Sequence, residues 1–120
     1  MITLLVSLMM LAAGLGAPRA QDPVRVITIT AERFDFSPSR LTVAPGEEVE
    51  LHLTSDDTAH GFQIDGTSID VEIPKRGRGK TVVRFRADGD GPYRFECSRM
   101  CGAGHHFMRG EIVVKPKDPK

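Results

Sequence analysis

The sequence is poor in aromatic residues and carries no net charge, and both shortages argue against a nucleic-acid-binding protein. It contains no tryptophan and one tyrosine, so it offers little aromatic surface for stacking bases. Its 16 basic and 16 acidic residues cancel, whereas nucleic-acid-binding domains usually carry a basic stripe. Four basic residues do cluster within 75–80, but glycines interleave with them, which favours a solvated hairpin turn. We expect no nucleic-acid partner.

Catalytic motifs are also missing. The chain has no Gly-x-Ser-x-Gly, no phosphate-binding loop, no His-Glu-x-x-His and no pair of carboxylates at a telling spacing. Hydrolase and kinase functions therefore have no support. The sequence leaves open whether the protein is an enzyme, and it favours a carrier or a non-catalytic subunit.

The one long apolar run, residues 2–17, is short for a membrane span, which needs about 20 residues. It suits the apolar region of a secretory signal peptide with Ala20 as the last residue before cleavage. The lack of Lys or Arg before the run, together with Pro18, leaves an uncleaved anchor as the alternative. We expect residues 1–20 to be a signal peptide or short N-terminal anchor. Residues 21–120 would form one exported domain, in the periplasm or on the outer face of the cytoplasmic membrane.

Short alternating segments dominate that domain. β-Branched and alternating apolar residues predict strands at 24–30, 41–43, 49–54, 81–86, 93–97 and 111–115. Turn-forming residues such as Pro45-Gly46 separate them. No stretch has the i, i+3, i+4 spacing of a long amphipathic helix. The pattern predicts an all-β antiparallel sandwich.

Candidate metal ligands concentrate between the last two predicted strands. The segment has no periodicity, which indicates a loop at one end of the sandwich, where functional residues are common. Its candidate ligands are Cys97, Cys101, His105 and Met108. Thiolate and thioether are soft ligands that, together with imidazole, suit copper far better than magnesium or calcium. The segment therefore predicts a copper site.

A fifth candidate, His60, lies 37 positions before Cys97, on the loop predicted after the 49–54 strand. The whole pattern, with Cys-x3-Cys-x3-His-x2-Met at its centre, resembles the periplasmic domain of cytochrome c oxidase subunit II. The similarity covers roughly residues 57–114. Matching segments are 57–62, 66–67, 93–94, the cysteine loop and 110–114. The resemblance implies a cupredoxin-like Greek-key sandwich with a binuclear copper centre of the CuA type.

The resemblance also implies a role for each residue of the centre. The implied copper ligands are His60, Cys97, Arg99, Cys101, His105 and Met108. Both cysteine sulfurs would bridge the two copper ions, and each histidine would bind one ion. The methionine and the backbone carbonyl of Arg99 would be weak ligands, one to each ion.

Two further residues next to the ligands are informative. Arg99 stands where the family commonly has Glu or Gln, which is tolerable because only the main chain coordinates. We expect its charge to raise the reduction potential or to change the docking surface. Asp57, three residues before His60, is a candidate to position the histidine loop, with an ordinary turn residue as the alternative.

The function implied by the resemblance is single-electron transfer between a cytochrome c-like donor and a terminal oxidase or reductase. Association with a membrane complex is part of that expectation. The family's N-terminal membrane helix is missing or reduced to the short apolar run, and the Trp-containing stretch ahead of the domain is absent. These departures favour a free-standing or loosely anchored carrier over a full oxidase subunit.

Other interpretations remain open at this point. A copper-delivery protein would hold Cu(I) exchangeably, and a mononuclear blue copper site would use only one of the two thiols. A disulfide between Cys97 and Cys101 is what two cysteines most often mean in an exported domain. A structural zinc site would leave Met108 without a purpose.

The docking surface is not defined by the sequence. Met100 and Phe107 either cover the metal or form an apolar docking patch. Acidic and basic residues mix near the predicted site, so the sequence gives no clear sign for the charge of the docking face.

Overall fold

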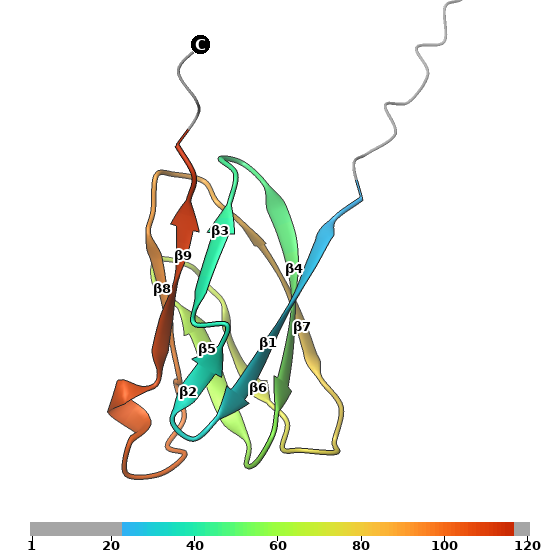
Figure 1. Ribbon diagram of the computed structural model, residues 1–120, viewed down its shortest axis with the longest axis vertical. Coiled ribbons are helices and arrows are strands. Elements are labelled where there is room, and N and C mark those ends of the chain that lie inside the picture. The colour runs from blue at the N-terminus through green and yellow to red at the C-terminus, as the bar shows by residue number, and fades with distance from the viewer. Residues whose placement is uncertain (1–22, 117–120) are drawn as a thin grey trace, which may run out of the picture.

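The computed structural model describes residues 23–116, so the predicted targeting segment 1–20 and its boundary lie outside the described residues. The described chain folds into nine strands and one short 3-10 helix (Figure 1). Their bounds are β1 (Arg25–Glu32), β2 (Asp35–Ser37), β3 (Arg40–Val43), β4 (Glu48–Ser55), β5 (His60–Ile64), β6 (Asp70–Ile73), β7 (Thr81–Arg86), β8 (Tyr93–Glu96), η1 (His105–Phe107) and β9 (Arg109–Val114). Within this part of the chain no helix is long and apolar enough to cross a membrane.

The strands form two sheets with the core between them. One sheet has the order β2-β1-β4-β7 and the other β3-β9-β8-β5-β6. β4 shows why they pack: every second residue is buried, from Val49 through Leu53 to Ser55. Alternation of this kind turns one face of a strand to the core and the other to water. The predicted all-β sandwich is confirmed.

Both sheets are mixed, which departs from the purely antiparallel arrangement expected. β1 runs parallel to β4, and β3 runs parallel to β9. The reason is the path of the chain. After β1, the strands β2 and β3 carry the chain back, one in each sheet, before β4 descends beside β1 (Figure 1). Parallel neighbours need such a long connection.

Three strands were not predicted, and one of them changes the place of His60. β2, β5 and β6 are short or lack clean alternation; β5 is buried at four of its five positions. A strand buried on both faces loses the period-two signal on which the prediction depends. His60 was expected in a loop, but it is the first residue of β5. This strand lies between β8 and β6 in its sheet.

Four connections meet at one end of the sandwich, the lower end in Figure 1. They are residues 33–34, 56–59, 74–80 and 97–108. The third contains the basic cluster, and it links β6 of one sheet to β7 of the other. The residues of the cluster are exposed to solvent, as predicted. They lie in a crossover between the two sheets, however, and not in a hairpin turn.

A group of phenylalanines supports this end from within. The rings of Phe36, Phe62 and Phe95 pack with centroids 5.2 to 5.8 Å apart. All three side chains are buried. Phe62 lies two residues after His60, and Phe95 lies two residues before Cys97, so both candidate ligand segments begin on the same packed core.

Candidate metal centre

Three predicted ligands meet at the loop-bearing end of the sandwich. His60, Cys97 and Cys101 each offer a ligand atom, and these atoms all lie within 4.8 Å of one another. The residues are 0%, 5% and 6% exposed. His60 comes from the start of β5 and the cysteines from the loop after β8, which the antiparallel β5–β8 pair brings together.

The imidazole of His60 is oriented by Asp57. Nε2 of His60 lies 2.6 Å from Oδ1 of Asp57, so the ring donates its Nε2–H to the carboxylate. The other nitrogen, Nδ1, is buried and has no hydrogen-bond partner among the described residues. A buried polar atom without a partner is costly, and such an atom is suited to bind an ion or a water molecule. Nδ1 therefore presents a free lone pair, as a metal ligand must.

Asp57 is itself held in place. Its Oδ2 accepts a hydrogen bond of 2.9 Å from the Arg33 N–H, and its Oδ1 accepts one of 2.7 Å from the Thr58 N–H. Burial raises the pKa of this carboxyl, but the hydrogen bonds from Arg33, His60 and Thr58 outweigh it and lower the pKa to about 2. Asp57 thus combines both expected roles: it shapes the turn and it contacts the histidine.

The cysteine loop is closed on itself. The Cys97 N–H donates to the Met108 carbonyl at 3.1 Å, which joins the two ends of the loop. The two sulfurs lie 3.6 Å apart, and both cysteines are free thiols. The Cys97 thiol also lies 3.1 Å from the Arg99 carbonyl, so that oxygen points into the cluster.

The remaining predicted ligands lie at the edge of this cluster. The sulfur of Met108 is 3.8 Å from the Cys101 sulfur, and the side chain is 1% exposed. Nδ1 of His105 is 3.9 Å from the same sulfur, but His105 is outside the group of three whose ligand atoms are mutually close. His106, its neighbour, is exposed; its ring packs edge-on against that of His105 with centroids 5.3 Å apart, and its backbone carbonyl accepts hydrogen bonds from Arg109.

The Cys101 thiol does not ionise readily in the metal-free protein. Burial, followed by the hydrogen bond and charge of Cys97, raises the pKa of Cys101 to about 11. This thiol is therefore protonated at neutral pH, and a metal must displace its proton to bind. Soft sulfur donors with imidazole fit copper, and they fit neither magnesium nor calcium.

Arg33 was missed by the sequence analysis, although it ties the two ligand segments together. Its N–H binds Asp57, and its Nε donates to the Cys101 carbonyl at 2.8 Å. Its neighbour Phe34 covers the loop so closely that a Cβ at Gly104 would come within 2.4 Å of the ring. No motif or periodicity marks these residues, because their contacts lie 24 and more positions away.

Gly61 is a second residue that was missed. A Cβ at this position would lie 2.3 Å from Ser98 Oγ and 2.7 Å from the Arg99 N–H nitrogen. The absence of a side chain lets β5 approach the cysteine loop, and Ser98 is fixed there by a 2.7 Å hydrogen bond to Asp70. The residue after the candidate ligand His60 is thus required to be small.

The fold and this cluster define a class: β-sandwich proteins with a buried sulfur and imidazole site at one end. Residues 1–114 match the cupredoxin-like domain family, and the chain belongs to it. The resemblance to cytochrome c oxidase subunit II is confirmed. The chain is 39% identical over 89 residues to cytochrome c oxidase subunit 2 of Thermus thermophilus, a match that covers 74% of this chain. The chain spans 64% of that relative's length.

Two solved structures have the same fold. A heme-copper terminal oxidase dimer contains a chain with TM-score 0.68 and 25% identity; the match covers 80% of this chain and 68% of the other. The periplasmic domain of subunit II of cytochrome oxidase from Bradyrhizobium japonicum has TM-score 0.68 and 18% identity, covering 78% of this chain and 85% of that domain. At that identity the second likeness establishes the fold alone.

Proposed function

We propose that this protein is an exported single-electron carrier with a binuclear copper centre. The observation that carries the proposal is the cluster of His60, Cys97 and Cys101, whose ligand atoms lie within 4.8 Å of one another. The two sulfurs, 3.6 Å apart, are close enough to act on the same metal pair. One free imidazole nitrogen is buried beside them.

The proposed ligand set extends that cluster. Cys97, Cys101, His60 and His105 would be the main residues that hold the copper. Met108 and the Arg99 carbonyl supply the weak ligands; both already lie within 4 Å of a cysteine sulfur, at 3.8 and 3.1 Å. The copper pair, when bound, supplies reversible one-electron chemistry.

The protein's own contribution is to keep the ligands still. His60 is held by Asp57, the cysteine loop is closed by its Cys97–Met108 backbone bond, and Arg33 connects the two segments. When the ligands keep their positions as the metal gains or loses an electron, the reorganisation energy of electron transfer is low. Burial excludes water from the cluster, so little solvent has to reorganise. This rigidity favours electron transfer over delivery, which requires the metal to exchange readily.

The donor in this proposal is a cytochrome c-like protein, and the acceptor is a terminal oxidase or reductase at the outer face of the membrane. The similarity to subunits of cytochrome c oxidases supports these partners. The apolar run at residues 2–17, which suits a secretory signal peptide, supports an exported location.

Copper content distinguishes the proposal from its alternatives. We expect two coppers per chain in the wild type and a coloured, slowly exchanging product. Cys101→Ser should bind one copper, because the loss of one of the two thiolates leaves too few soft ligands for a pair. One copper per chain in the wild type would identify a mononuclear site, and a colourless, readily exchanged Cu(I) would identify a delivery protein.

Adjacent histidines give a matched test of the ligand set. His105→Ala should alter the absorption spectrum of the loaded protein, since it removes a proposed ligand. His106→Phe, one residue along the same short helix, should leave the spectrum unchanged because that side chain is exposed and the substitution keeps a ring against His105. An unchanged spectrum in His105→Ala would remove this residue from the centre.

A further inference from the structure

The connections at the two ends of the described sandwich differ in charge, although Arg25, Arg86 and Lys115 lie at or next to the strand ends opposite the site. The four connections at the site end carry six basic residues and two carboxylates. The basic residues are Arg33, Lys75, Arg76, Arg78, Lys80 and Arg99, and the carboxylates are Asp56 and Asp57. At the opposite end, the adjoining loops 44–47 and 87–92 carry three carboxylates and no basic residue. The positive end is therefore the end with the candidate metal centre.

Part of that positive charge is already neutralised by neighbours. Arg99 lies 3.4 Å from Glu72, and Asp57 accepts hydrogen bonds from the Arg33 backbone N–H and from His60. Glu32, Asp35 and Glu96 are the carboxylates at the strand ends that adjoin these connections. The 74–80 loop differs. Lys75, Arg76 and Arg78 are exposed, and among the described residues their side chains form no ion pair.

This basic loop is fixed beside the metal-site loops. The Arg76 N–H donates to the Asp57 carbonyl at 3.0 Å, which joins it to the segment that leads into His60. Two glycines with positive φ, Gly77 at 79° and Gly79 at 97°, shape the turn. Its cations therefore stand at a defined place next to the site instead of on a loose arm.

Exposed apolar side chains gather at the same end. Phe107 is 82% exposed and Met100 is 78% exposed, and both are in the cysteine loop. Phe34, 36% exposed, packs against the glycines of that loop. The structure thus decides between the two roles considered for Met100 and Phe107: neither side chain is buried over the cluster. Exposed apolar residues grouped in this way mark an interaction site.

We infer that this end of the molecule is a docking surface for an acidic redox protein. The partner would place an apolar edge on Met100, Phe107 and Phe34, and a rim of carboxylates against Lys75, Arg76 and Arg78. An apolar centre with a charged rim at one side is the anatomy of a protein–protein interface, and the charged rim steers the encounter. The inference rests on the proposed function for the redox nature of the partner.

The test uses one haem protein in two charge states: native lysine-rich cytochrome c, and the same cytochrome with its lysines succinylated. Binding to the full chain, kept reduced and metal-free, is measured at low ionic strength. The succinylated form should bind more tightly than the native form, and the preference should weaken as salt is added. Equal binding of both forms, or tighter binding of the native form, would overturn the inference.

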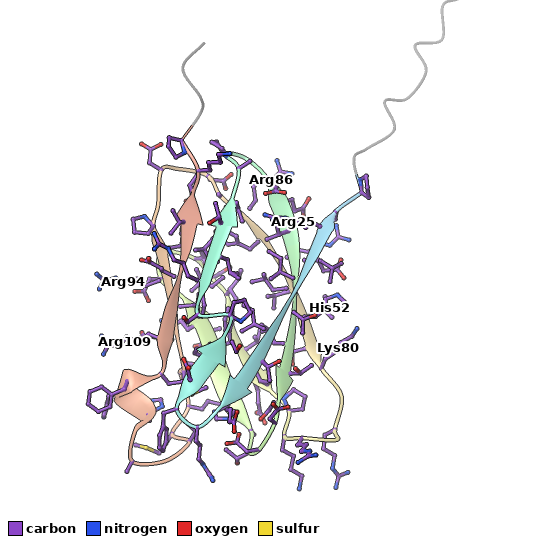
Figure 2. All side chains as sticks on the ribbon, in the orientation of Figure 1. Arg25, His52, Lys80, Arg86, Arg94 and Arg109 are labelled. Carbon is purple, nitrogen blue, oxygen red and sulfur yellow. The ribbon has the colours of Figure 1, made fainter. Side chains whose placement is uncertain are left out.

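Two double variants locate the surface. Lys75→Ser with Arg78→Ser should weaken binding of the succinylated cytochrome about fivefold, as expected for two rim charges. The control is Arg94→Ser with Lys115→Ser, which also removes two positive charges but at positions away from the site end. Figure 2 shows Arg94 part-way up the sandwich, above the cysteine loop. This control pair should leave binding unchanged. An equal loss in both pairs would show that net charge, not this surface, controls binding.

Phe107→Ser tests the apolar centre of the surface. It should weaken binding of the succinylated cytochrome at high salt as well as low, because the contact it removes is not electrostatic. Unchanged binding by Phe107→Ser would contradict the proposed docking surface. Tighter binding of the protein to phosphatidylglycerol vesicles than to the succinylated cytochrome would also contradict it. Because binding is measured without metal, failure of this docking surface and failure of the copper proposal are separate results.

Discussion

The carboxylate of Asp57 lies 2.6 Å from Nε2 of His60, and this contact decides which ring nitrogen is available to a metal. With Nε2–H donated to the carboxylate, Nδ1 keeps its lone pair, and among the described residues it has no other partner. A carboxylate behind a metal-binding histidine fixes both the tautomer and the orientation of the ring. The aspartate is thus a positioning residue for the proposed centre.

Replacing that carboxylate should weaken copper binding. We expect Asp57→Ala to lower copper affinity by about 10- to 100-fold, the usual effect of losing such a partner. Competition with a Cu(I) chelator measures it. Asp56→Ala is the matched control, because the neighbouring side chain makes no contact with His60 and its loss should leave the affinity unchanged. Equal effects of the two substitutions would contradict the positioning role.

The same residue should make the stability of the metal-free protein depend on pH. The pKa of Asp57 is about 2 in the fold against an ordinary 3.8, so its contribution is fully present above about pH 4 and is lost as the pH falls toward 2. The shift corresponds to at most about 2 kcal/mol. Urea unfolding of the reduced, metal-free protein and of Asp57→Asn measures it. Their difference in unfolding free energy should be largest near pH 6 and shrink below pH 4; a constant difference would be inconsistent with this account.

Gly61 should tolerate no side chain. In Gly61→Ala, the new Cβ would meet Ser98 Oγ at 2.3 Å and the backbone nitrogen of Arg99 at 2.7 Å, so β5 and the cysteine loop must separate. We expect a loss of about 1–3 kcal/mol in unfolding free energy, typical of overpacking, together with impaired copper uptake. Gly89→Ala is the control, since its Cβ would meet only the Tyr93 hydroxyl at 3.4 Å. Equal stability in the two variants would refute the close approach.

The free thiols should oxidise when copper is absent. Their sulfurs are 3.6 Å apart, so a mild oxidant should join Cys97 to Cys101, abolish copper uptake and leave no titratable thiol. A reductant should restore both. Protein loaded with copper before the oxidant is added should keep its metal and its colour. Thiol titration checks this, and rapid oxidation of the loaded form would argue against both sulfurs being ligands.

How far the sequence predicts this structure depends on the kind of signal involved. The strands with clean alternation, such as β4 and β7, were expected to within one residue, because the alternation of apolar and polar side chains is visible in the sequence. The short strands β2 and β6 and the largely buried β5 were not expected. β2 and β6 are too short to show a repeated alternation, and β5 is buried at four of its five positions. The parallel pairs depend on the path between the sheets, which local patterns do not encode.

The site divides in the same way. The cysteine loop carries its candidate ligands within twelve residues, so spacing and chemistry alone single them out, and the family pattern adds the distant His60. Arg33 and Gly61 act only through contacts made in the folded chain, with Asp57, the Cys101 carbonyl and Ser98. Nothing in their immediate neighbours distinguishes them from an ordinary turn arginine and strand glycine.

The central claim is that two sulfurs 3.6 Å apart share two copper ions, and the paramagnetic resonance spectrum of the copper-loaded, partly oxidised protein tests it most directly. The account predicts hyperfine structure from one unpaired electron divided equally between two equivalent copper nuclei. A spectrum in which the electron couples to one copper nucleus alone would contradict it.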